Sequence, residues 1–490
     1  ILFFIVLAYG FVPQVLGGKI VNQSDISGWQ GMSHEMMEWN KEHPDDQTAW
    51  TESMFGGMPT TTIHASTKGD LTQYFYDFLT TFGKRPATYL FISLLGAWLL
   101  MLSFGVSPLI AIGGAIAVTF CSYNLQIIQV GHNTKMQAIA FFPWVLAALA
   151  YVWNFAIKKE RWLPYTALGA ALFGMALNFQ IKANHPQITY YLALVVLIYS
   201  IVMIVWYLRD AKRRATINRF LISCGLLLVM GCAGIATNAI KLLPTYEYTP
   251  YSMRGGNPDA NGGATKGLDM DYATAWSYGW EEIPNLLIPN FNGGSSSGAG
   301  NPRKSETYSL LKKAGQPNLK EVSKALPLYW GPQPFTAGPM YMGAVTIFLF
   351  MLALLCYKGK GKWWILATCI LSILLALGSH LMWFTKFFYN YVPLYNKFRT
   401  VSMAMVILQI CLPLLAFIFL DRMVKDNDAA QAFKKKGWIA LAVTGGFCLL
   451  CLLIPGLAGN FRGAADASLP DVLSDALADD RRGMLKADAL

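Results

Sequence analysis

The sequence has little charge for its length. Only 14% of its 490 residues are Asp, Glu, Lys or Arg, whereas 54% are hydrophobic. Soluble domains usually carry about 25% charged residues, so this composition excludes an ordinary soluble protein and indicates a set of membrane spans. The net charge of +11 does not indicate a nucleic-acid surface, because the basic residues lie in short loops between apolar runs. We therefore expect a membrane protein with no nucleic-acid partner.

The sequence also lacks the spacings of disulfide frameworks and metal sites. Its eight cysteines lie inside or at the edges of apolar runs, and the closest pair, Cys448 and Cys451, is in the middle of one. Cysteines in such positions usually pack as small hydrophobic residues. The six histidines show no HExxH motif and no clustered spacing. The sequence thus names no metal ligands, and a divalent cation bound through loop acids is the one cofactor left open.

Long apolar runs dominate what is present. Eleven of them can cross a bilayer core of about 30 Å. They lie near residues 2–17, 87–105, 107–127, 137–156, 163–180, 187–208, 220–242, 339–357, 363–379, 400–420 and 437–457. We therefore predict an all-α polytopic membrane protein of about eleven transmembrane helices.

The distribution of Lys and Arg predicts the orientation of these spans. One set of loops holds about 16 of them in roughly 40 residues, and the remaining loops hold about 22 in roughly 230. The basic set consists of 157–162, 209–219, 358–362 and 421–436. Because cytoplasmic loops are enriched in Lys and Arg, we expect this set inside. The long loops expected outside are 18–86, 243–338 and 380–399.

The chain is therefore expected to have one large membrane part. We treat 1–457 as the transmembrane domain, with the three outer loops inserted in it. Residues 458–490 would be the start of an outer, periplasmic segment that continues beyond residue 490. Because most of the loop mass falls on one side, we expect the functional residues there.

The first outer loop contains two amphipathic segments, 27–40 and 70–83. In the second, apolar residues recur at helical spacing and form one stripe. The stripe consists of Leu71, Tyr74, Phe75, Phe78, Leu79 and Phe82. Such helices can lie in the headgroup plane of a membrane, or they can pack on the end of the helix bundle. The pattern favours neither arrangement.

Polar residues collect at the outer ends of several spans, while the span centres are almost uncharged. Four stretches contribute, around His132 and Asn133, around Lys182, around Lys241, and around Arg399. They are either helix ends that meet water, with long cations reaching the interface, or the lining of a polar cavity with cations for a phosphate. Asp25 follows the first span closely and is held near the membrane surface, but its spacing favours the N-cap of the next helix.

Several segments resemble the YfhO family of bacterial membrane proteins, which look like class C glycosyltransferases. The resemblance rests on the early Asp25 and on five stretches of sequence. These are WTESMFGGMP, GHNTK at 131–135, WSYGWEEIPNLLIPNFNGG at 276–294, YWGPQPFTAGPMYMGAV at 329–345 and NKFRTVSM at 396–403. The match covers most of the chain. The paired acids of that class are absent, because Ser24 precedes Asp25 and Ile26 follows it.

The resemblance implies a class C fold, with membrane-parallel helices and a catalytic acid in the first outer loop. It also implies an inverting transfer of sugar from a polyprenyl-phosphate donor in the bacterial cytoplasmic membrane. Asp25 would be the catalytic acid by its position. Displacing a phosphate also needs positive charge, which Arg399, Lys241 or Lys182 could supply. The residues expected at the acceptor and sugar are His132, Asn133, Trp276, Glu281 and Glu282.

Two other functions remain open from the sequence. The same fold could serve as a non-catalytic scaffold or assembly subunit, or as a lipid transporter. The transporter is disfavoured because the spans carry almost no central charge and show no evident inverted repeat. In each case the partners are the membrane and a lipid. The sugar, the acceptor and any protein partner are not specified by the sequence.

Overall fold

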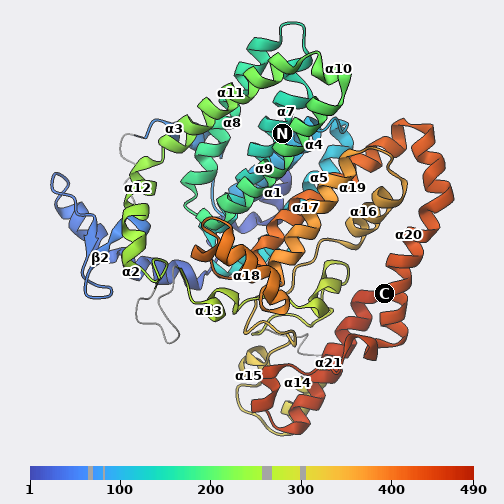
Figure 1. The fold of residues 1–490 in the computed structure, drawn as a ribbon. Coiled ribbons are helices and arrows are strands. Elements are labelled where there is room, and N and C mark those ends of the chain that lie inside the picture. The colour runs from blue at the N-terminus through green and yellow to red at the C-terminus, as the bar shows by residue number, and fades with distance from the viewer. Residues whose placement is uncertain (64–69, 81–82, 257–266, 298–304) are drawn as a thin grey trace. The chain divides into compact units, whose positions relative to one another are not determined.

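The computed structural model describes residues 1–63, 70–80, 83–256, 267–297 and 305–490. Helices make up nearly all of its regular structure (Figure 1), and β1 (Trp50–Thr51) and β2 (Met58–Pro59) form one short antiparallel pair. The chain forms two compact units. Unit 1 comprises Ile1–Ala115 and Ile127–Leu268, and unit 2 comprises Ile116–Gln126 and Asp269–Leu490. The all-α class predicted from the apolar runs is confirmed.

Unit 1 is organised around one long buried helix. α7 (Asn133–Asn154) packs against α4 (Ala87–Ser103), α8 (Trp162–Lys182) and α9 (Pro186–Arg209), and α8 also packs against α11. Because α7 is apolar on most of its surface, it can be enclosed on several sides. The other helices that begin in or cross this unit are α1 (Leu2–Phe11), α5 (Pro108–Thr119), α6 (Ser122–Val130), α10 (Ala211–Arg214), α11 (Ile217–Ala236) and α12 (Ala239–Tyr248).

The first loop of unit 1 carries the two amphipathic helices expected from the sequence. They are α2 (Ser24–Glu42) and α3 (Thr72–Leu79), with the β1–β2 pair between them. The apolar stripe of α3 is turned away from the rest of the protein, because Leu71, Tyr74, Phe75 and Phe78 are all exposed. The predicted stripe residue Phe82 lies outside the described residues. An exposed apolar stripe is what a helix in contact with lipid would present.

Unit 2 is also built around a buried helix. α19 (Met405–Lys425) packs against α16 (Ala344–Cys356), α17 (Gly361–Ala376) and α20 (Asn427–Leu453). The remaining α-helices of this unit are α13 (Met270–Thr274), α14 (Glu306–Lys313), α15 (Leu319–Ala325), α18 (Met382–Tyr391) and α21 (Asp471–Ala489). Its hydrophobic centre is therefore a second bundle, with its own central helix.

When helices are judged by their length, the structure has fewer candidate spans than the eleven apolar runs suggest. Five of the described helices are long and apolar enough to cross a membrane, and up to seven if two bent pairs each count as one span. The shorter apolar helices α1, α4 and α16 coincide with three of the predicted runs. A run of apolar sequence does not reveal where a helix inside it begins or breaks, and this accounts for the difference. The protein is a helical membrane protein.

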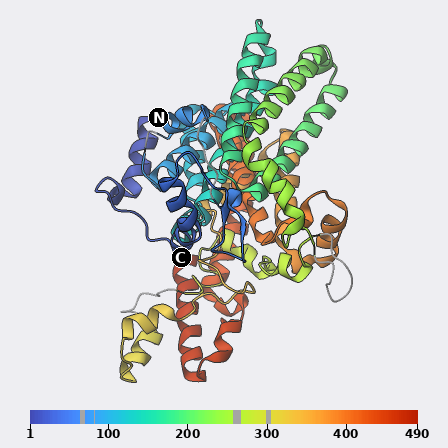
Figure 2. The same ribbon diagram turned by 90° about the vertical axis from the view of Figure 1, so that its left-hand side faces the viewer.

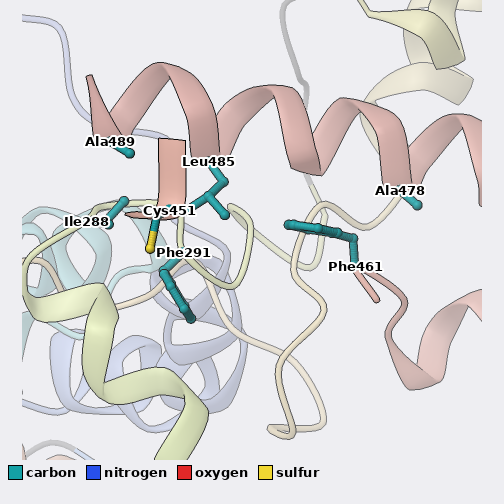
Figure 3. Packing of buried hydrophobic residues seen from close by; sticks show 7 residues of the cluster. All are labelled: Ile288, Phe291, Cys451, Phe461, Ala478, Leu485 and Ala489. Atoms are coloured by element: carbon teal, nitrogen blue, oxygen red, sulfur yellow. The ribbon is translucent and has the colours of Figure 1, made fainter. Parts of the chain in front are cut away.

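The C-terminal segment forms a small part of unit 2, here called the cap, together with an earlier loop. The cap consists of residues 305–330 and 458–490. α21 lies against α14 and α20, and Figure 2 shows α20 and α21 in red with the yellow helices α14 and α15 beside them. Figure 3 shows the hydrophobic cluster beneath α21, in which Phe461 and Leu485 are fully buried. Residues 458–490 thus pack onto an earlier loop of the chain.

A buried ion pair fixes the cap. Arg481 is fully buried and pairs with Asp466 through both terminal nitrogens, with N–O distances of 2.5 and 2.9 Å. Its other hydrogen bonds go to the carbonyls of Pro327, Leu328 and Phe461 at 2.7, 3.0 and 2.7 Å. Five acceptors therefore satisfy the five N–H donors of the guanidinium group. These hydrogen bonds offset the desolvation cost of burying the charge.

Candidate functional site

The residues singled out from the sequence fall into both units. Asp25, His132, Asn133, Lys182 and Lys241 belong to unit 1, and Trp276, Glu281, Glu282 and Arg399 belong to unit 2. Within unit 1 the structure brings Asp25, His132 and Asn133 together at one place, and Lys182 and Lys241 at another. Convergence between residues of unit 1 and Arg399 of unit 2 stays a prediction.

Asp25 is held in the first turn of α2, against the start of α7. The N-cap position belongs to Gln23, so the interpretation of Asp25 as a helix cap is wrong. Gln23 and Asn133 exchange hydrogen bonds through both amides, at 3.3 and 3.1 Å, and Gln23 also donates to the Ile128 carbonyl at 2.5 Å. This reciprocal pair joins the two helix N-termini, so the role that the structure gives Asn133 is positional.

Gly131 permits this close approach. Its φ of +100° lies in the region that glycine alone adopts at little cost. A Cβ at this position would lie 3.0 Å from the Cβ of Gln23 and 3.2 Å from the Cβ of Asp25. The glycine of the GHNTK segment therefore makes room for the residue predicted to be catalytic.

Asp25 ends a short chain of polar groups. Its Oδ2 lies 2.9 Å from Nε2 of His132, and Nδ1 of His132 lies 3.2 Å from Nζ of Lys135. A lysine ammonium can only donate, so Nδ1 is the accepting nitrogen and Nε2 carries the hydrogen that is donated to Asp25. Lys135 is buried, whereas the side chains of Asp25 and His132 are 48% and 41% exposed. The carboxylate is thus oriented from the protein side and open on the other.

A second histidine lies in the same electrostatic environment. His185 is the N-cap of α9, and its Nδ1 accepts from the Ile188 N–H at 3.4 Å. Burial lowers the pKa of His185 to about 3, and the positive charge of Lys135 acts in the same direction. His185 is therefore neutral across the physiological range. It adds a polar group near the Lys135 ammonium without adding charge.

Lys182 and Lys241 form a separate group with an acid. Nζ of Lys182 lies 2.7 Å from Oδ2 of Asp70 and 5.7 Å from the ring centre of Tyr76, while Nζ of Lys241 donates to the Lys182 carbonyl at 3.3 Å. Burial alone would raise the pKa of Asp70, but hydrogen bonds from Lys182 and Thr72 outweigh it and lower that pKa. Asp70 therefore stays ionised and forms an ion pair with Lys182, a cation predicted to bind phosphate.

The residues of unit 2 that were predicted to bind the substrate differ in exposure and in their partners. Arg399 donates to the hydroxyl of Tyr272, with its guanidinium 5.4 Å from the centre of that ring. Trp276 packs edge-on against Phe335 and donates to the Phe335 carbonyl at 3.1 Å. Glu281 is exposed. Of these, Arg399 and Glu281 are the charged groups accessible to a ligand.

Glu282, predicted to contact sugar, is instead fully buried. Its carboxylate accepts from the Tyr329 hydroxyl at 2.6 Å, from the Gly279 N–H at 2.8 Å and from the amide of Gln333 at 2.9 and 3.2 Å. Burial is the largest influence on its pKa, which is raised. Every accepting direction is taken within unit 2, so this arrangement is structural.

Sequence reasoning did not assign a role to Lys135 or to the Asp70–Lys182 pair. The spacing of three residues between His132 and Lys135 places both on one helix face at the start of α7, and that signal could have identified the pair. Nothing in the sequence separation of Asp70 and Lys182 could do so. Among the described residues, no group of three or more His, Cys, Asp or Glu is placed to hold a metal ion.

No family model, curated protein or solved structure matches the chain.

Proposed function

We propose that the protein is a membrane glycosyltransferase that moves a sugar from a lipid-phosphate donor to an acceptor at the outer face of the bacterial cytoplasmic membrane. The observation that carries the proposal is the chain Lys135–His132–Asp25 in unit 1. It supplies a half-exposed carboxylate whose orientation is fixed by a neutral imidazole and a buried cation. A general base needs this combination of access and fixed orientation.

In this mechanism Asp25 is the base. The acceptor hydroxyl attacks the anomeric carbon of the sugar while its proton passes to the Asp25 carboxylate. The bond between the anomeric carbon and the phosphate oxygen breaks, the configuration inverts, and the polyprenyl phosphate leaves with both bonding electrons. His132 and Lys135 are positioning residues that hold the carboxylate in a fixed direction. Inversion in one step requires no covalent intermediate with the protein.

Positive charge for the departing phosphate would come from Lys182, Lys241 and Arg399. Asp70 holds Lys182 by a charge-assisted hydrogen bond, and a lipid phosphate is a stronger acceptor with more oxygens. We infer that the donor phosphate replaces Asp70 at Lys182. Because α3 begins two residues after Asp70, this exchange would also move the helix with the exposed apolar stripe.

The proposal includes the finer architecture predicted from the sequence. It takes the eleven apolar runs as eleven crossings, with the first outer loop forming the membrane-parallel helices of a class C glycosyltransferase. Long loops 18–86 and 243–338 then lie outside. Cysteines introduced at these loops should react with an impermeant maleimide on intact cells, while cysteines at 209–219 and 421–436 should not.

The test is transfer by purified protein in vesicles that contain a radiolabelled polyprenyl-phosphate hexose and membrane extract as acceptor source. Asp25→Asn should reduce release of polyprenyl phosphate by at least about 100-fold, since general base catalysis contributes roughly 100- to 10,000-fold. Asp45→Asn, an exposed acid in the same loop, is the matched control and should retain activity. Equal turnover by Asp25→Asn and the wild type would refute the catalytic assignment.

A non-catalytic scaffold is the second candidate, and Glu282 favours it. A residue expected to bind sugar is used to tie loops of unit 2 together, as a purely structural protein would use it. The same assay distinguishes the two functions. A scaffold would release no polyprenyl phosphate in any variant, and Asp25→Asn would leave its stability and its partners unchanged.

A further inference from the structure

One apolar segment of unit 2 contains a break with unusual polar surroundings. α5 ends at Thr119, α6 begins at Ser122, and the two helices are bent by 45°. Residues 339–342 bind the break, because Ser122 donates through its N–H to the Tyr341 carbonyl at 3.2 Å and through Oγ to the Pro339 carbonyl at 3.0 Å. A helix that ends there leaves its last carbonyls without N–H donors from the same helix.

Two buried amides meet at these carbonyls. Nδ2 of Asn124 donates to the carbonyls of Val118 and Thr119 at 3.3 and 3.0 Å, and Nε2 of Gln409, from α19, donates to the Val118 carbonyl at 3.2 Å. Because a carbonyl oxygen only accepts, the nitrogen of each amide must face it. The orientation of both side chains is therefore set by chemistry.

The amide oxygens of these two side chains have no hydrogen-bond donor in the described part of the chain. Asn124 and Gln409 are fully buried, and neither Asn124 Oδ1 nor Gln409 Oε1 has a hydrogen-bond partner among the residues that the structure describes. Pro413 follows Gln409 by four residues in α19 and has no N–H, so the Gln409 backbone carbonyl also loses its usual donor. An unsatisfied polar group costs several kcal/mol in apolar surroundings, so several oxygens here require a positive or donating species.

The sign of the local field favours a cation. The last carbonyls of α5 form the negative end of its helix dipole, and the available ligands are neutral oxygens. Such oxygens suit alkali-metal ions, and broken membrane helices bind sodium through half-helix C-terminal ends and unwound carbonyls. Transition metals would need histidine or cysteine ligands, and the described residues offer no such group.

We propose that the break between α5 and α6 binds an alkali-metal cation, of the Na⁺ or K⁺ class, through the unpartnered side-chain oxygens of Asn124 and Gln409. This inference is independent of the proposed transferase activity, because all of its residues lie in unit 2 and none acts on sugar or phosphate. The ion would stabilise the bend and link α19 to the broken span. Its loss would loosen that contact.

The test is thermal unfolding of the full purified chain in detergent, with NaCl, KCl or choline chloride at equal ionic strength. Wild-type protein should unfold at a higher temperature in NaCl or KCl than in choline chloride, with an effect that saturates. Gln409→Met should abolish this ion dependence. Asn124→Leu, which removes the other unpartnered side-chain oxygen, should abolish it as well.

Gln180→Met is the matched control. Gln180 is a fully buried glutamine of unit 1 whose Oε1 accepts from Thr189 at 2.9 Å and whose leftover atom is Nε2, a donor. This variant should keep the ion dependence of the wild type. If Gln409→Met does not fold, the comparison of salts with the wild type still decides, since it needs no variant. Equal unfolding temperatures of the wild type in all three salts would overturn the proposal and assign the unpartnered oxygens to internal water.

Discussion

Each unit buries a glutamine, and in the part of the chain that the structure describes these two glutamines leave opposite atoms without a partner. Gln180 of unit 1 has an amide nitrogen without a partner among the described residues, whereas Gln409 of unit 2 has an amide oxygen in that state. Gln180 accepts from the Thr189 hydroxyl, while Nε2 of Gln409 donates to the Val118 carbonyl. The two glutamines therefore offer opposite groups to a ligand, a donor in unit 1 and an acceptor in unit 2.

The largest expected effect that separates the units concerns their buried ion pairs. Arg481→Met in unit 2 removes a cation that satisfies five acceptors and leaves Asp466 buried without it. We expect a loss of about 3–5 kcal/mol in the free energy of unfolding of the cap. Lys182→Met in unit 1 leaves Asp70, whose side chain is 27% exposed, and should cost roughly 2 kcal/mol.

Limited proteolysis and denaturant titration of the purified variants measure both losses. Arg482→Met is the control, because Arg482 is adjacent in sequence and its pair with Asp479 is about half exposed. It should change the free energy of unfolding by less than about 1 kcal/mol. Comparable losses for Arg481→Met and Arg482→Met would show that burial does not decide the strength of these pairs.

The second prediction uses pH to separate the units. The pKa of His185 in unit 1 is lowered by burial, so its contribution to stability is complete above its unfolded value of 6.5 and is lost as the pH falls below it. The pKa of Glu282 in unit 2 is raised by burial, so its contribution is complete below 4.5 and is lost as the pH rises through the folded pKa.

Unfolding temperatures between pH 4 and 7 should therefore respond to two variants in opposite ways. His185→Gln should reduce the loss of stability on acidification, and Glu282→Gln should reduce the loss of stability as the pH rises. Protease cleavage in unit 1 and unit 2, followed by mass spectrometry, assigns each change to its unit. If both variants shift the pH dependence in one direction, the opposite pH responses assigned to His185 and Glu282 are wrong.

The smallest expected effect concerns two short helices with exposed aromatic faces. In α3 of unit 1 Phe75 and Phe78 are exposed, and in α18 of unit 2 Trp383, Phe387 and Tyr391 are exposed. Spin labels at Phe75 and Trp383 should both be more accessible to oxygen than to a water-soluble nickel complex in vesicles, as expected for helices at a membrane surface. A label at Phe75 that prefers the nickel complex would remove α3 from the membrane.

The sequence predicted the helical class and the apolar stripe of α3, and it singled out Asp25 and His132, which the structure brings into contact. These follow from periodicity and from position relative to a span, which are local properties. The break between α5 and α6 was not predicted, because Phe120 and Cys121 contain no helix breaker and the partners of Ser122 lie near residue 340. Such breaks depend on contacts that a single window of sequence does not contain.

The sequence also did not reveal which polar residues pair with each other. Glu281 and Glu282 are identical in type and adjacent, yet one is exposed and the other is buried with Tyr329 and Gln333. Lys182 was expected to be available to phosphate, and its ion pair with Asp70 spans 112 positions of the chain. Partner choice at this separation is decided by packing of the whole unit.

The five-acceptor arrangement of Arg481 also has a consequence for biosynthesis. The carbonyls of Pro327 and Leu328 are made about 150 residues before the arginine that binds them, since Arg481 and Leu328 are 153 positions apart. Between them the ribosome must make α16, α17, α19 and α20. The cap can therefore close only after these helices and residues 458–490 have been synthesised. Until then the loop at 305–330 lacks its main partner.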